Sequence, residues 1–140
     1  MPKLVWRKGM TLAEVLVVLV ILAIFVSLAV PKFERAMEAA IGREAHVALE
    51  LIYAAEQVVY AQTGNYVGCD DINNGFGDCN NALNITLRPG NWQYVVIAGV
   101  PPPPSFDAVA TRSGGSAAYN NTTIVLRSDT TWLGTWPIPY

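Results

Sequence analysis

The sequence predicts an α+β fold in which one long N-terminal α-helix packs on a small antiparallel β-sheet of three to four strands. An uncharged, mostly apolar run extends from Val15 to Val30, and a stripe of apolar residues at helical spacing follows it. The C-terminal half then holds short segments rich in aromatic and β-branched residues, separated by turns. We expect the first half of the helix to span a membrane and its second half to be amphipathic.

The apolar run is long enough for a membrane span. Counted from Leu12, it approaches the roughly 20 apolar residues that a transmembrane helix needs, and only Glu14 interrupts it. A carboxylate inside such a segment costs a few kcal/mol unless it is paired, so Glu14 is a functional-site hypothesis. The alternative is that Glu14 only extends to the aqueous edge of the membrane.

A cleaved secretory signal and a plain membrane anchor compete with a more specialised segment. Lys3, Arg7 and Lys8 form a basic flank that all three would have. Residues 27–29, Ser-Leu-Ala, resemble a signal cleavage site. Against a signal peptide, Glu14 would interrupt its apolar core, and the helical pattern continues past residue 29.

The residues Lys8-Gly9-Met10-Thr11-Leu12-Ala13-Glu14, followed by the apolar run and by Pro31, resemble the N-terminal signature of type IV pilins and type II secretion pseudopilins. In that family a prepilin peptidase cuts after the glycine and the new N-terminus is methylated. The resemblance implies cleavage between Gly9 and Met10 and N-methylation of Met10, where the family commonly has Phe. Glu14 becomes the fifth mature residue and Pro31 the twenty-second. The resemblance covers about residues 8–35.

The resemblance also implies a domain organisation: a leader peptide at 1–9, a transmembrane and polymerisation helix at 10–31, and a pilin-like head at 32–140. The precursor would cross the bacterial inner membrane once, with its head outside the cytoplasm, and would then enter an extracellular pilus or a periplasmic pseudopilus. The implied partners are copies of itself, related minor pilins, a prepilin peptidase, an inner-membrane assembly platform and membrane lipid.

Glu14 acquires a physical role in this scheme. After cleavage, the α-amine of Met10 is a cation in the same apolar layer as the Glu14 carboxylate. Helices staggered along a filament could place the amine of one subunit beside Glu14 of its neighbour, so that the two desolvation penalties offset each other. Such a pair would fix the axial register, because a one-residue slip would leave both charges unpaired.

Composition argues against nucleic-acid binding. Without Lys3, Arg7 and Lys8, six of the nine basic residues remain against 11 acidic ones, which gives a formal charge of −5. No basic patch is left to contact phosphates. Charged residues make up only 14% of the chain, which fits a subunit buried in an assembly.

Cys69 and Cys79 are the only cysteines, and in a chain outside the cytoplasm such a pair favours a structural disulfide over a metal or redox site. The bridge would close an 11-residue loop and contribute about 2.7 kcal/mol on the chain-entropy estimate. Many type IV pilins instead bridge a loop near the C-terminus. Residues 70–81 are crowded with Asp and Asn, but Ile72 breaks the calcium-loop spacing, so a solvated polar loop is favoured over calcium binding.

The helix is expected to run from Met10 to about Ala61, where Thr63-Gly64-Asn65 supplies a stop signal. Pro31 removes one backbone donor and should kink it. One face of the helix is expected to carry an apolar stripe: Ile41, Ala45, Ala48, Ile52, Ala55 and Val59. The charged residues of this part of the helix lie mostly off that stripe: Lys32, Glu34, Arg35, Glu38, Arg43, Glu44, Glu50 and Glu56.

Three strands are expected, at 92–98, 106–112 and 122–127, with a short fourth piece around 131–136. Short connections between them imply an antiparallel meander, one face of which would cover the apolar stripe of the helix. Trp92, Trp132 and Trp136 are assigned to the core and the C-terminal edge of this sheet rather than to a ligand site. Residues 131–137 remain a candidate contact surface.

No catalytic constellation, metal site or cofactor site is expected. His46 is predicted to be exposed and without a ligand partner. The conclusion is a structural subunit of a type IV pilus-like filament, with a secretion pseudopilin as the alternative. A monomeric membrane-anchored domain that binds a carbohydrate or peptide through Trp132 and Trp136 is a further alternative. An enzyme would require a pocket that gathers Asp107, Asp129 and His46.

Overall fold

The computed structural model describes residues 9–99 and 104–138. The chain forms two compact units, Met1–Met37 and Glu38–Tyr140. The N-terminal unit contains the first part of helix α1 (Leu12–Thr63), and the C-terminal unit contains the rest of α1 together with all of the strands. The leader proposed for residues 1–9 lies almost wholly outside the described residues.

Helix α1 begins where the sequence provides an N-cap. The hydroxyl of Thr11 accepts a hydrogen bond from the backbone N–H of Glu14 at 3.2 Å, which is the pairing that an N-cap threonine makes with the third helical residue. The helix continues through Pro31 to Thr63. Gly64 follows it in the left-handed conformation, with φ of 77°, and its N–H bonds to the carbonyl of Tyr60, as predicted for the helix stop.

In the C-terminal unit, the face of α1 that is buried differs from the predicted stripe. The buried residues are Glu38, Gly42, Ala45, Leu49, Ile52 and Glu56. Ala45 and Ile52 were predicted, whereas the other four stripe positions are only half-buried against the core. The prediction that the charged residues lie off the buried face is wrong for Glu38 and Glu56. Both have a specific polar partner inside the head, which offsets the cost of burying them.

The sheet has five strands where three to four were predicted, all antiparallel and ordered as in the sequence. They are β1 (Cys69–Asp70), β2 (Trp92–Gly99), β3 (Ser105–Arg112), β4 (Thr123–Arg127) and β5 (Trp132–Gly134). The additional strand is β1, which is only two residues long and lies in the segment predicted to be a polar loop. A short helix, α2 (Asp78–Leu83), follows it.

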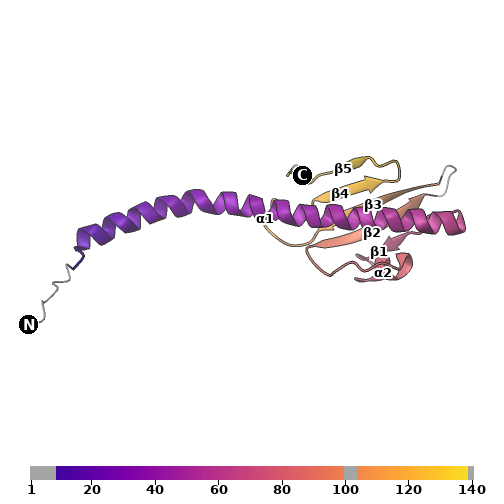
Figure 1. The fold of residues 1–140 in the computed structure, drawn as a ribbon, viewed down its shortest axis with the longest axis horizontal. Coiled ribbons are helices and arrows are strands. Elements are labelled where there is room, and N and C mark those ends of the chain that lie inside the picture. The colour runs from indigo at the N-terminus through magenta and orange to yellow at the C-terminus, as the bar shows by residue number, and fades with distance from the viewer. Residues whose placement is uncertain (1–8, 100–103, 139–140) are drawn as a thin grey trace, which may run out of the picture. The chain divides into compact units, whose positions relative to one another are not determined.

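Alternation along the strands sets which side chains face the core. In β3 the buried residues are Phe106, Ala108, Ala110 and Arg112, and β2 and β4 alternate in the same way. This face of the sheet lies along the second half of α1 (Figure 1). The main core unites α1 residues such as Leu49 and Ile52 with Trp92, Phe106 and Ile124, each of which is at most 2% exposed.

Candidate assembly helix and the contacts that fix the head

The predicted processing residues lie at the start of the described chain. Gly9 and Met10 are exposed and precede the first turn of α1, and the Met10 side chain is 67% exposed. Nothing lies within 4 Å of the position that a side chain on Gly9 would occupy. The bond between them is therefore open to solvent in the structure.

Glu14 lies in the first turn of α1 and is exposed. Its backbone N–H is capped by Thr11, and no ion pair involves its carboxylate within the part of the chain that the structure describes. An anion in the first turn of a helix is stabilised by the helix dipole by less than about 1 kcal/mol at an exposed site, which is small beside the cost of burying it in an apolar layer. Pro31 is also exposed, in the interior of the helix.

The apolar side chains between Glu14 and Pro31 have no cover within their own unit. Every described residue from Gly9 to Met37 is exposed, and the large apolar side chains from Val15 to Val30 are 43–64% exposed. The helix is long and apolar enough here to cross a membrane, judged by length and composition. An uncovered apolar surface of this extent marks a membrane or protein contact.

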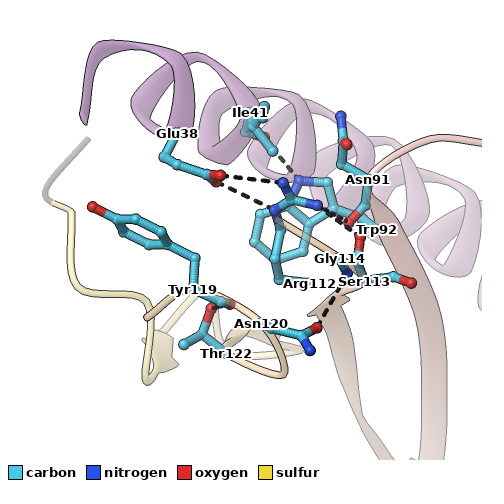
Figure 2. A network of polar contacts seen from close by, with 10 residues as sticks. All are labelled: Glu38, Ile41, Asn91, Trp92, Arg112, Ser113, Gly114, Tyr119, Asn120 and Thr122. Atoms are coloured by element: carbon cyan, nitrogen blue, oxygen red, sulfur yellow. Dashed lines mark hydrogen bonds and ion pairs between the residues drawn. The ribbon is translucent and has the colours of Figure 1, made fainter. Parts of the chain in front are cut away.

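A buried ion pair fixes the start of the head (Figure 2). The guanidinium of Arg112 donates to both carboxylate oxygens of Glu38, through Nε at 3.3 Å and through Nη2 at 3.2 Å. The third nitrogen, Nη1, donates to the backbone carbonyls of Asn91 and Ser113 at 3.0 and 2.8 Å. The arginine thus ties α1 to the loop before β2 and to the turn after β3.

The sequence contains a signal for this pair that the predicted stripe did not include. Arg112 is six residues after Phe106 on β3, so the period of two places it on the buried face, directly opposite Trp92. Glu38 precedes Gly42 and Ala45 by four and seven residues, which is the spacing of one helix face. Extending the strand alternation to Arg112 and the helix-face spacing to Glu38 therefore predicts that these two opposite charges face each other.

The C-terminal segment closes over α1 at Gly42. The indole nitrogen of Trp136 would lie only 2.7 Å from a Cβ at position 42, so any larger residue there would collide with the ring. Trp136 also packs edge-on against Trp92, with ring centroids 5.1 Å apart. Figure 2 shows the hydrogen bond that the Trp92 indole donates to the carbonyl of Ile41, at 2.8 Å. These contacts bear out the assignment of Trp92 and Trp136 to the core and its edge.

Glu56 is the second acidic residue on the buried face. Its side chain is fully buried, and its Oε2 atom accepts a hydrogen bond from the N–H of Val67 at 3.0 Å, which fixes the chain just after the helix. Its other carboxylate oxygen has no hydrogen-bond partner among the described residues. Burial raises the pKa of Glu56, and the bond from Val67 opposes this shift only in part.

The prediction that His46 is exposed is wrong. Its ring is half-buried and lies against that of Trp132, with centroids 4.1 Å apart. Burial lowers the pKa of His46, and the nearby carboxylate of Glu50 opposes this shift. The reason is the fifth strand: β5 brings Trp132 over the side of α1 that carries His46, and Trp132 packs against the core there.

Cys69 and Cys79 form a disulfide, with a Cα–Cα distance of 4.9 Å, and both are buried. The bridge joins β1 to α2. Between them Asp71 is buried, not solvated as predicted for this loop, because its Oδ1 atom accepts the N–H groups of Gly77 and Cys79 at 3.1 and 3.0 Å. Within residues 9–99 and 104–138 no group of three or more His, Cys, Asp or Glu side chains is placed to hold a metal ion.

The enzyme alternative named Asp107, Asp129 and His46, and the structure shows contacts for each of them. Asp107 forms an exposed ion pair with Arg127 at 3.5 Å, and Asp129 accepts a hydrogen bond from the backbone of Thr131. His46 lies against Trp132 instead. Arg127 also acts electrostatically on Asp129, so the two aspartates share one cationic neighbour.

Residues 7–30 match the family model of the prokaryotic N-terminal methylation motif, which is the signature of type IV pilins and pseudopilins. The match contains Gly9, Met10 and Glu14. No curated protein matches the chain, and no solved structure matches it. The methylation motif supports a pilin-like or pseudopilin protein, and the apolar N-terminal helix and the disulfide fit it; the match does not extend to the head.

Proposed function

Starting from the pilin and pseudopilin signature at residues 7–30, we propose that the chain is a structural subunit of a type IV pilus-like filament, cleaved after Gly9 and polymerised through its N-terminal helix. The observation that carries this proposal is the apolar helix surface from Val15 to Val30, which has no cover within its own unit. Lipid would cover it before assembly, and helices of other subunits would cover it afterwards.

The proposed organisation has three parts: a leader at 1–9, a membrane and polymerisation helix at 10–31, and a head at 32–140 outside the cytoplasm. The leader would be removed by a prepilin peptidase and Met10 methylated. The inner membrane would hold the subunit until an assembly platform transfers it into the filament, where it would meet copies of itself and related minor pilins.

Glu14 would set the register of assembly. Cleavage creates a cationic amine on Met10, four residues from the Glu14 carboxylate, and neither charge has a partner of opposite sign elsewhere in the apolar segment. When helices stagger so that the amine of one subunit meets Glu14 of the next, both charges are neutralised inside the apolar layer. Removal of one partner leaves the other charge buried and unpaired, which costs about 3–5 kcal/mol in buried pairs.

The experiment is to express the chain with a prepilin peptidase and an assembly platform and to measure filaments sheared from the cells. Glu14→Ala should abolish or strongly reduce the filaments while leaving cleavage and membrane insertion intact. Glu34→Ala is the matched control, because Glu34 is also an exposed acid on α1 but lies outside the apolar run. Equal filament yields from both variants would contradict the role of Glu14.

A secretion pseudopilin is the second candidate, favoured by the position of the disulfide. Cys69–Cys79 closes a loop just after α1, whereas many type IV pilins bridge a loop near the C-terminus. Deletion of the gene separates the two functions. A pseudopilin predicts loss of protein secretion with no long surface filaments at native expression, and a pilus subunit predicts the reverse.

A further inference from the structure

The head carries a second apolar stripe on α1, on the side away from the sheet. Val47, Leu51, Ala54 and Val58 each follow a buried residue of the core face by two positions, which is a rotation of about 200° around a helix with 3.6 residues per turn. All four are exposed, Val47 by 67% and Val58 by 56%. An apolar stripe opposite the core is not needed to fold the head.

The spacing of this stripe is that of a helix–helix seam. Its steps of four, three and four residues continue toward the N-terminus through Ala40, Met37 and Phe33, with Glu44 as the single charge. The same alternation reaches back to Leu12 without a break. An apolar repeat of 3.5 residues is the pattern by which one helix packs along another.

A groove runs beside the stripe, between α1 and the segment of residues 83–88. Two adjoining hollows of about 360 and 210 Å³ form it, and Leu51 lines both. On the far side, Leu83 and Ile85 line the first hollow, and Leu87 and Arg88 line the second. The α1 side runs from Glu44 to Gln62, a length of about 27 Å at 1.5 Å per residue.

The outer wall of this groove is held in place by specific bonds. The side chain of Asn80 donates to the carbonyl of Leu87 at 3.0 Å and accepts its N–H at 2.6 Å. Asn80 lies in α2, which the Cys69–Cys79 disulfide joins to β1. A groove whose wall is fixed in advance loses less conformational entropy when it is occupied.

We propose that this groove is the docking site for the Val15–Val30 segment of a second copy of the chain. That segment is an apolar helix of about 24 Å at 1.5 Å per residue, so its length fits the groove, and it shares the 3.5-residue seam. Among residues 9–99 and 104–138, nothing in its own unit covers this segment, and nothing fills the groove. The inference rests on the proposed function, since it names where the polymerisation helix of one subunit meets the head of another.

The test is site-directed crosslinking in filaments of the full chain with its native disulfide intact. One copy carries Leu51→Cys, and a co-expressed copy carries a cysteine in the N-terminal helix. Seam positions are Leu16, Leu19 and Val26, and Val18 and Ile21 are controls on the opposite face of that helix. The expected result is a crosslinked dimer at a seam position, severalfold more abundant than at either control.

A substitution pair gives the second readout. Leu51→Asp should lower the filament yield at least about tenfold, the change that corresponds to 1.4 kcal/mol. Ile97→Asp is the control, because Ile97 is equally apolar and 61% exposed on β2, away from the groove. A cooperative unfolding transition of each purified variant in detergent, as in the native chain, shows that its head has folded.

The outcomes separate the two proposals. Filaments that form but give only Leu51–Leu51 crosslinks would mean that heads meet face to face, and the docking site would be wrong while the filament proposal stands. Filaments with no crosslink above the controls, or with a normal yield for Leu51→Asp, would overturn the docking site in the same way. A chain with the native sequence that is not cleaved and forms no filaments would overturn both.

Discussion

Arg112 connects three parts of the head that are far apart in the sequence, and it does so while 3% exposed. A buried guanidinium needs acceptors for its donors, and here Glu38 and the carbonyls of Asn91 and Ser113 together accept four hydrogen bonds from it. Gly115 lies directly above the pair, since a Cβ there would be 2.8 Å from Nη2 of Arg112. The turn at Gly115 therefore covers the charged group of Arg112, which must stay paired with Glu38.

This arrangement predicts an order among substitutions at the ion pair. Arg112→Met should lower the free energy of unfolding by about 3–5 kcal/mol, because the buried Glu38 carboxylate and the Ser113 carbonyl lose the donors that Arg112 supplies, whereas the Asn91 carbonyl keeps the N–H of Ser113. Glu38→Leu should cost at least as much, because the guanidinium of Arg112 cannot lose its charge and would stay buried without a counter-ion. Denaturant titration of the full chain in detergent measures both, and Arg127→Met, which breaks only the exposed pair with Asp107, serves as the control.

The stability of the head should depend on pH through Glu56. Because burial raises its folded-state pKa above the ordinary value of 4.5, the folded chain holds this proton to a higher pH than the unfolded chain does. The free energy of unfolding from this group therefore falls as the pH rises from about 4.5 through the folded-state pKa. Glu56→Gln should remove that slope in melting temperature against pH, whereas Glu34→Gln should leave it unchanged.

His46 acts in the opposite direction. Burial lowers its folded-state pKa below the ordinary value of 6.5, so its contribution to stability is lost as the pH falls from about 6.5 through the lowered value. With rising pH the two contributions therefore change in opposite directions and partly offset each other. A pH profile of His46→Gln that is identical to that of the native sequence would contradict this assignment.

At the scale of elements, the C-terminal segment depends on the absence of a side chain at Gly42. Gly42→Val should displace Trp136 from α1 and destabilise the head by about 1–3 kcal/mol, the usual cost of overpacking a close contact. A shift of tryptophan fluorescence toward that of exposed indole is the direct readout. Ala40→Val, at an exposed position on the same helix, should have little effect, and an equal shift in both variants would contradict the contact.

The elements themselves were largely predictable. Alternation of apolar residues located β2, β3 and β4 to within one residue, and Gly64 marked the end of α1. Strand β1 was missed because two residues carry no periodicity, and it exists only through its pairing with β2 and the disulfide. The burial of Glu38 and Glu56 was not predicted, because a stripe defined by apolar residues cannot include an acidic one. Partners distant in the sequence stabilise them, Arg112 for Glu38 and Val67 for Glu56.

At the scale of the whole molecule, the central claim is that residues 1–9 are a leader and that the mature chain begins with an apolar helix. The methylation motif at 7–30 and the exposed apolar surface from Val15 to Val30 both point to this. In the sequence, this prediction rests on the distances from Gly9 to Glu14 and Pro31. No comparable sequence motif in the head indicates a role in adhesion, movement or secretion. Such a role depends on the partner that the head surface binds, and the sequence of this chain does not contain that partner.

The most direct test is the intact mass and N-terminal sequence of the protein recovered from its native membrane or from shed filaments. The account predicts a chain that begins at Met10, with or without one added methyl group. A chain that begins at Val30 would instead be a secreted protein released by signal peptidase, and an uncut chain would be a plain membrane anchor. Either of these two results would contradict the account.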